Sequence, residues 1–136
     1  MPAQLILDTG PFIALVDRSE KRHADCVRTF SSWSGLILTT EAVLTETLHL
    51  VGSWRAQQVC LEFVTRGAFL VVPSSVESLK RVTALMEKYR DVPMDFADAT
   101  LVALSEEAET EQIFTLDRSG FLVYRRLGKR PFTVIP

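Results

Sequence analysis

The sequence has few of the residues that usually mark a zinc site, a disulfide framework or a membrane span. Its 136 residues include two histidines and two cysteines, and their spacing matches no metal or redox motif. No apolar run approaches the roughly 20 residues that a membrane-spanning helix needs, and the N-terminus does not resemble a signal peptide. We therefore expect a cytoplasmic protein in which Cys26 and Cys60 are free, buried thiols.

An excess of charge of one sign is also missing. The 15 lysines and arginines stand against 17 aspartates and glutamates, which gives a formal net charge of −2. This balance supplies no long-range attraction for nucleic acid. A polyanion would therefore have to be attracted by a metal ion or by a local basic patch. A chain of this length fits one domain, and we expect residues 1–136 to form it.

Short apolar runs alternate along the chain with segments of helical spacing. Because parallel neighbouring strands need crossover connections, this alternation predicts an α/β fold with a parallel sheet covered on both faces. The expected strands are residues 5–7, 36–40, 69–72, 112–116 and 132–135, and the expected helices are residues 12–16, 23–33, 41–51, 54–65, 76–89 and 95–109.

The first apolar run ends in a carboxylate. Residues 5–7 are apolar without alternation, which is typical of a strand covered on both faces. Gly10 and Pro11 then suit a tight turn into a helix. Asp8 would lie at the carboxyl end of the strand, where open α/β sheets bind ligands. The alternative is that Asp8 only caps the next helix.

Two further acids, Glu46 and Asp117, are candidates for the same site as Asp8. Glu46 shares a helix side with Ala42 and Val43, where an isolated acid is costly to bury. Asp117 directly follows the strand predicted at residues 112–116. Each also has a structural explanation, since Glu46 could lie at the margin between helix faces and Asp117 could begin a turn through its own side chain.

Asp95 and Asp98 begin the helix predicted over residues 95–109. Both suit the positive end of a helix dipole, Asp95 as the N-cap and Asp98 in the first turn. Asp98 also lies one turn before Leu101 and Val102, so we expect it to face the sheet.

Four of these acids can meet at one crevice, because Asp8 and Asp117 follow strands while Glu46 and Asp98 lie on flanking helices. Carboxylates about 4 Å apart repel by several kcal/mol at an effective dielectric near 20, so the cluster needs a cation. Oxygen ligands without histidine or cysteine favour Mg²⁺ or Mn²⁺ over zinc. A carboxylate-held ion of this kind is suited to chemistry on phosphate esters.

The order and spacing of these segments resemble the PIN-domain ribonucleases, and among them the VapC toxins of bacterial and archaeal toxin–antitoxin pairs. The resemblance covers nearly the whole chain, although none of its short motifs is specific alone. The matching segments are Leu7-Asp8-Thr9, the segment from Val43 to Leu48 around Glu46, the segment from Asp95 to Ala99, and Thr115-Leu116-Asp117 with Phe121 after it.

This resemblance implies a three-layer PIN-like fold with a five-stranded parallel sheet in the order 3-2-1-4-5. It also implies an endoribonuclease that cleaves RNA phosphodiester bonds with water activated by Mg²⁺ or Mn²⁺. The family's catalytic and metal-binding acids correspond here to Asp8, Glu46, Asp98 and Asp117, with Asp95 as a further ligand. Thr9 matches a small hydroxyl residue that assists metal-bound water or phosphate.

RNA would be held by other groups. The basic residues near the C-terminus that could contact its backbone are Arg118, Arg125 and Arg126, with Lys129 and Arg130 nearby. We expect such binding to depend on salt and to be largely blind to sequence. The alternative is a solvated basic surface. The resemblance further implies a homodimer and a cognate antitoxin protein that covers the cleft.

Two other functions remain open from the residues alone. One is a magnesium-dependent phosphatase of another α/β fold, but the haloacid-dehalogenase kind needs a second aspartate at the position that Gly10 occupies. The residues also lack the paired acids and late lysine of a response-regulator receiver. The other is a non-catalytic PIN-like interaction module, against which the intact set of acids argues.

Overall fold

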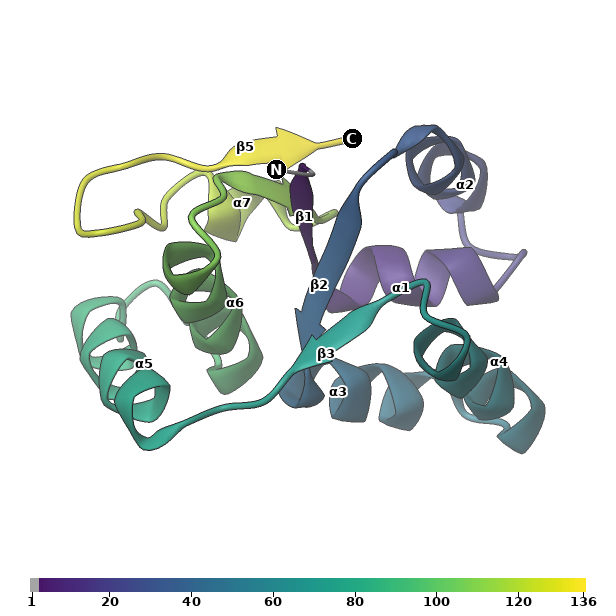
Figure 1. Cartoon of the computed structure of the whole chain (residues 1–136), viewed down its shortest axis with the longest axis horizontal. Helices are drawn as coiled ribbons and strands as arrows, with labels where there is room; N and C mark the ends of the chain where they lie inside the picture. The colour runs from purple at the N-terminus through teal and green to yellow at the C-terminus, as the bar shows by residue number, and fades with distance from the viewer. Residues whose placement is uncertain (1–2) are drawn as a thin grey trace.

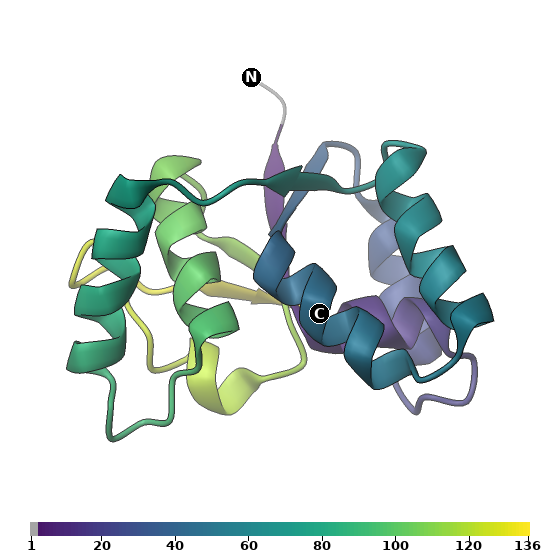
Figure 2. The same cartoon turned by 90° about the horizontal axis from the view of Figure 1, so that it is seen from below.

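Five parallel strands form the centre of the fold, with helices on both sides (Figures 1 and 2). The computed structural model describes residues 3–136. The strand order is β3-β2-β1-β4-β5 with every neighbouring pair parallel, so the predicted fold class and topology are confirmed. The elements are β1 (Gln4–Leu7), α1 (Thr9–Val16), α2 (His23–Ser32), β2 (Leu36–Thr40), α3 (Glu41–Val51), α4 (Trp54–Thr65), β3 (Leu70–Val72), α5 (Val76–Lys88), α6 (Phe96–Glu107), β4 (Gln112–Phe114), α7 (Arg118–Phe121) and β5 (Thr133–Ile135).

Strand β1 is central to the sheet. Leu5 pairs with Ile37 of β2, while Ile6 pairs with Ile113 of β4 on the other side. All apolar residues of β1 are fully buried, as expected for a strand covered on both faces. Asp8, which follows β1, therefore lies at the middle of the carboxyl edge of the sheet.

Helices α1, α2 and α4 lie on one side of the sheet, and α5 and α6 lie on the other (Figure 2). Helix α3 contacts α1, α4 and α6, so it lies between the two helix layers. Because α3 begins directly after β2, it lies beside the carboxyl edge at which β1 also ends. This arrangement places the acids of α3 and α6 near the end of β1.

Most differences between the predicted and observed elements are shifts of their ends. The predicted bounds of α3 and α4 agree with the structure, but α1 begins at Thr9 because Asp8 caps it and Pro11 fits its first turn. Strand β4 ends at Phe114, before the predicted residue 116. Helix α7 was not predicted, because the segment after Asp117 looks like a turn in the sequence.

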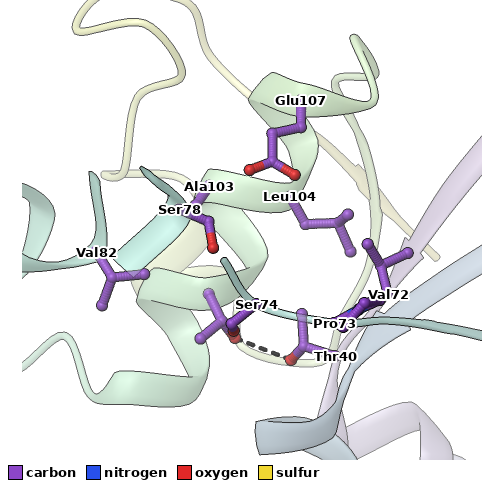
Figure 3. Close-up of a pocket in the computed structure, with 10 residues that line it drawn as sticks. Thr40, Val72, Pro73, Ser74, Ser78, Val82, Ala103, Leu104 and Glu107 are labelled. Atoms are coloured by element: carbon purple, nitrogen blue, oxygen red, sulfur yellow. Dashed lines mark hydrogen bonds between the residues drawn. The ribbon is translucent and has the colours of Figure 1, made fainter. Parts of the chain in front are cut away.

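A small cavity lies between the end of β3 and helices α5 and α6 (Figure 3). Its volume is about 10 Å³, which is room for about one water molecule. Thr40 and Thr100 share a hydrogen bond of 2.9 Å at its wall. The cavity is therefore a packing gap with polar walls, too small for a substrate.

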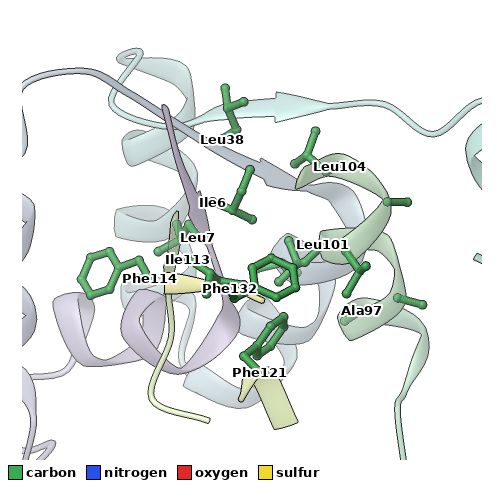
Figure 4. Packing of buried hydrophobic residues seen from close by; sticks show 14 of the residues in the cluster. Ile6, Leu7, Leu38, Ala97, Leu101, Leu104, Ile113, Phe114, Phe121 and Phe132 are labelled. Carbon is green, nitrogen blue, oxygen red and sulfur yellow. The ribbon is translucent and has the colours of Figure 1, made fainter. Parts of the chain in front are cut away.

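The apolar core lies on both sides of the sheet. On the α6 side, Leu101, Ile113, Phe121 and Phe132 pack together, as Figure 4 shows. On the α1 side, rings from α1, α2, α4 and the segment before β3 pack edge to face or stacked, with centroids 5.0 to 6.1 Å apart. These packed layers hold the ends of the strands and helices in fixed positions.

Both cysteines, Cys26 and Cys60, are free and buried, as predicted. Burial raises the pKa of both thiols. Among the residues that the structure describes, no helix is long and apolar enough to cross a membrane.

Candidate functional site

Asp8 is fixed at the end of β1 by contacts on both of its carboxylate oxygens. Its Oδ1 accepts a hydrogen bond of 2.7 Å from the Thr9 backbone N–H, and its Oδ2 accepts one of 2.7 Å from the Thr115 hydroxyl. The residue is 7% exposed. Asp8 is the N-cap of α1, so capping and a functional role are compatible here.

Asp95 and Asp98 form a capping box at the start of α6. The Asp98 backbone N–H donates to Asp95 Oδ1 at 2.8 Å, and the Asp95 backbone N–H donates to Asp98 Oδ2 at 3.3 Å. The cap predicted for Asp95 is thus confirmed. Asp98 is half-buried and also accepts a hydrogen bond from the Tyr124 hydroxyl, at 3.3 Å.

Asp117 follows β4 and is the N-cap of α7. Its Oδ1 accepts hydrogen bonds from the Gly120 backbone N–H at 3.1 Å and from the Ser119 hydroxyl at 2.8 Å. The Thr115 hydroxyl, which donates to Asp8, accepts the Asp117 backbone N–H at 2.9 Å. Thr115 therefore links the two acids that follow strands.

Glu46 lies on α3 and is half-buried. Together with Asp95, it lines an open groove of about 710 Å³ between α3 and the beginnings of α5 and α6. The helix is less buried on this side than an apolar face usually is, because Leu50, one turn later, is 58% exposed. The groove thus begins at the acids and continues along a partly apolar surface.

The acids are close enough to change one another's ionisation. The pKa of Asp8 is raised to about 6: burial is the largest cause, the hydrogen bonds from Thr115 and Thr9 oppose it, and the charges of Asp117 and Glu46 add to it. Burial also raises the pKa of Asp98 above its usual range, and Asp95, Asp8 and Asp117 add to this effect. The structure thus brings together the predicted acids.

Within residues 3–136, none of these five acids forms a salt bridge with a lysine, arginine or histidine. Their charge is left without a cationic side chain, although partly buried carboxylates elsewhere in the chain have one. Such a set of oxygen ligands fits a hard divalent cation.

The geometry limits how such a cation could be held. In the described part of the chain, no three aspartate, glutamate, histidine or cysteine side chains are arranged closely enough to hold one ion. That all five acids are ligands stays a prediction. Mg²⁺ commonly keeps several waters and uses one or two carboxylates, so the donors still fit it.

The side chain of Thr9 gives a second indication that a polar ligand binds in the site. Its hydroxyl oxygen is buried and has no hydrogen-bond partner among the described residues. A buried hydroxyl without a partner is costly unless water, an ion or a ligand satisfies it. Its place beside Asp8 is the one predicted for a group that assists bound water or phosphate.

The three arginines predicted to bind RNA differ in their surroundings. Arg118 is exposed, and its Nη1 donates to the Pro136 carbonyl at 3.2 Å. The guanidinium of Arg125 donates to the last carbonyls of the α7 region, including that of Leu122 at 2.9 Å. Arg118 is the first residue of α7 and adjoins Asp117, whereas Arg125 lies beyond the other end of this helix.

Arg126 requires a correction. It is 5% exposed, and its Nη2 donates to the Ser105 carbonyl near the far end of α6. A guanidinium buried there cannot contact a substrate at the other end of the helix. Charge in the sequence suggested RNA binding, but the structure gives Arg126 a role in packing.

Two residues near the acids were given no role from the sequence. Thr115 was named only as part of the segment Thr115-Leu116-Asp117, although its place two positions before Asp117 at the end of a strand is a usable signal. Tyr124 follows α7 in a segment without helical or strand periodicity, so no pattern indicated it.

The fold and these side chains define a class of protein in which a parallel α/β sheet presents clustered carboxylates at its carboxyl edge. A model of the PIN domain matches residues 5–127, and this chain belongs to the PIN-domain family. The resemblance inferred from the motifs is therefore confirmed.

A curated relative is ribonuclease VapC26 of Mycobacterium tuberculosis, which is 29% identical over 135 residues, covering 97% of this chain and all of the relative. VapC20 of the same organism, described as a toxin that cleaves the sarcin-ricin loop, superposes with a TM-score of 0.79 at 19% identity, covering 84% of this chain and 90% of VapC20.

A toxin–antitoxin complex from Klebsiella pneumoniae contains a chain similar to this one, with a TM-score of 0.71 at 17% identity, covering 97% of this chain and 96% of that chain. VapBC2 of Rickettsia felis, bound to a promoter DNA fragment, gives a TM-score of 0.69 at 10% identity, covering 98% of this chain and all of that chain. At such low identities these structures establish the fold alone.

Proposed function

We propose that this protein is a metal-dependent endoribonuclease and the toxin of a VapC-type toxin–antitoxin pair. Its similarity to a VapC ribonuclease along the whole chain supports this function. The observation that carries the proposal is Asp8, a buried carboxylate among other acids that has no cationic partner in residues 3–136.

Mg²⁺ or Mn²⁺ would be held by Asp8, Asp98 and Asp117, in part through water, with Glu46 and Asp95 at the rim of the site. When bound, an ion of this kind neutralises the phosphate and activates water for in-line attack. The three central acids then supply charge and orientation, since the carboxylate of each accepts hydrogen bonds from its own surroundings.

The chain's other groups serve binding and orientation. Thr115 fixes the Asp8 carboxylate, and the unpartnered Thr9 hydroxyl is free to donate to a phosphate oxygen or to water. Arg118 and Arg125 flank the site and would contact the RNA backbone. These arginines add attraction that the chain's net charge does not provide.

The proposed role also has consequences for assembly. We expect a cognate antitoxin to cover the acids, because two of the similar structures contain toxin–antitoxin pairs. The protein would act as a homodimer in the cytoplasm, where structured RNAs are available.

Cleavage of structured RNA by the purified protein tests the proposal. We expect cleavage with magnesium and none with a chelator, and we expect Asp8→Asn to remove it. Asp91→Asn, which changes an exposed acid of the loop after α5, is a matched control and should retain full activity. Equal cleavage with magnesium and chelator would refute the proposal. If no RNA were cleaved and Asp8→Asn behaved like wild type, the non-catalytic alternative would be favoured instead.

A further inference from the structure

Tyr124 lies behind the acids and directs its hydroxyl toward one of them. The residue is 1% exposed, and its ring packs edge to face against Phe121 at 5.1 Å and Tyr89 at 5.2 Å between centroids. Among the described residues, Asp98 is the one hydrogen-bond partner of its hydroxyl, through Oδ2 at 3.3 Å. A hydroxyl buried in an aromatic cluster needs such a partner.

The contact joins two separate elements of the site. Asp98 is in the first turn of α6, while Tyr124 follows α7, the helix that Asp117 caps. The rings around Tyr124 leave its side chain little freedom, so its hydroxyl is a fixed donor. A fixed donor on one oxygen restricts the rotation of the Asp98 carboxylate.

Gly120 lies so close to Asp117 and Tyr124 that there is no space for a side chain at this position. A Cβ at this position would lie 2.6 Å from Asp117 Oδ2 and 3.1 Å from the Tyr124 hydroxyl oxygen. The Gly120 backbone also contacts both neighbours, since its N–H donates to Asp117 Oδ1 and its carbonyl accepts the Tyr124 backbone N–H at 3.0 Å. The missing side chain therefore leaves the space that the Asp117 carboxylate and the Tyr124 hydroxyl both border.

We propose that Tyr124 is a positioning residue that holds Asp98 for a divalent cation, and that Gly120 is required because a side chain there would collide with both Asp117 and Tyr124. The proposal rests on the proposed metal-dependent function and specifies which residues set the geometry of the acids. Tyr124 contacts neither substrate nor cation in this role. It acts through Asp98, as outer hydrogen-bond partners commonly orient metal ligands.

The test compares Tyr124→Phe with Tyr89→Phe by titration calorimetry with Mn²⁺ alone. Both changes remove one buried tyrosine hydroxyl from the same ring cluster, but the Tyr89 hydroxyl accepts the Arg125 backbone N–H and contacts no acid. We expect Tyr124→Phe to weaken Mn²⁺ binding about tenfold. Tyr89→Phe should bind Mn²⁺ as the wild type does, even if its melting temperature falls.

Gly120→Ala supplies a second measurement that does not depend on the tyrosine variant folding. Its Cβ should displace Asp117 and the Tyr124 hydroxyl, so Mn²⁺ binding should weaken by at least as much as in Tyr124→Phe. Circular dichroism of each variant shows whether it is folded.

Unchanged Mn²⁺ affinity in folded Tyr124→Phe would overturn the positioning role. Equal losses in both tyrosine variants would also overturn it, because packing rather than the contact with Asp98 would be responsible. In either case, magnesium-dependent RNA cleavage by the wild type would leave the proposed function standing. A wild-type protein that neither binds Mn²⁺ nor cleaves RNA would refute both.

Discussion

The acids at the two ends of α6 have opposite surroundings. At the start of the helix, burial and neighbouring acids raise the pKa of Asp98, and no cationic side chain in residues 3–136 pairs with it. Near the other end, Glu106 accepts two hydrogen bonds from Arg81, at 2.7 and 2.9 Å, and one from the Leu127 backbone N–H at 2.6 Å.

The pKa of Glu106 reflects this difference. Burial would raise it, but the hydrogen bonds from Arg81 and Leu127 and the charges of Arg81 and Arg126 hold it below its usual range. The fold is thus able to satisfy a partly buried carboxylate where only stability is required. Under the proposed function, a bound cation would balance the charge of the acids at the other end of α6.

The largest expected effect comes from removing the charge of Asp98. Asp98→Asn should reduce magnesium-dependent RNA cleavage about a thousandfold, since stabilisation of transition-state charge by an ion is worth several kcal/mol. The protein should remain folded, because the change removes repulsion from the acid cluster. Single-turnover cleavage rates and thermal melts measure the two effects. A variant that cleaves at the wild-type rate would show that this end of α6 is structural.

At the other end of α6, we expect a substitution of Glu106 to lower stability and to leave activity unchanged. Glu106→Gln should lower the free energy of unfolding by about 3 kcal/mol, because Arg81 loses its carboxylate partner and the charge of the buried Arg126 is no longer offset. The cleavage rate of the folded fraction should not change. Urea unfolding measures the stability, with Glu87→Gln, in an exposed pair with Arg90, as a control that should change it little. A loss of activity without a loss of stability would contradict the assignment.

Asp8 should make the metal-free protein less stable as pH rises. Its pKa is about 6 in the folded state against 3.8 in the unfolded chain. The protonated form therefore favours folding, and this contribution is full below pH 3.8 and is lost as pH rises through about 6. At neutral pH, Asp8→Asn should raise the free energy of unfolding of the metal-free protein by about 2 kcal/mol.

This difference between Asp8→Asn and wild type should shrink as the pH is lowered from 7 to 5. Denaturant unfolding in the presence of a chelator measures it at each pH. A gap that stays constant, or that widens on acidification, would show that Asp8 is not held in an unfavourable ionised state.

The smallest expected effect concerns the surface arginines. Arg118→Ala should weaken RNA binding about threefold and reduce the slope of log affinity against log salt by about 1, since one phosphate contact is lost. Arg66→Ala, at the exposed end of α4, should change neither quantity. Filter binding of RNA at several salt concentrations, without divalent metal, separates the two variants. Equal effects of both would point to general charge rather than to a binding site beside Asp117.

The sheet could be predicted from the sequence because its strands are short apolar runs bounded by turn residues. The unbroken run of residues 5–7 indicated a central strand, and Gly52 after α3, which adopts φ of 79°, marked a helix end. Helix α7 could not be found, because four residues show no helical period and Asp117 with Gly120 resembles a turn.

The acids of the site could be located because strand ends and helix starts fix where carboxylates fall. The residues that contact these acids could not be located in this way. The contact of Tyr124 with Asp98 depends on the path of the chain after α7, and the burial of Arg126 depends on how that segment returns to α6. Both are set by tertiary packing between distant segments, which local patterns of residue type do not record.

The most direct test of the central claim is the change in melting temperature that magnesium causes in wild type and in Asp8→Asn. A ligand that binds only the folded state stabilises it, and the stabilisation grows with the logarithm of the ratio of ligand concentration to Kd. We expect magnesium to raise the melting temperature of the wild type and to leave that of Asp8→Asn nearly unchanged. An equal rise in both proteins, or no rise in the wild type, would contradict the claim that these acids form a cation site.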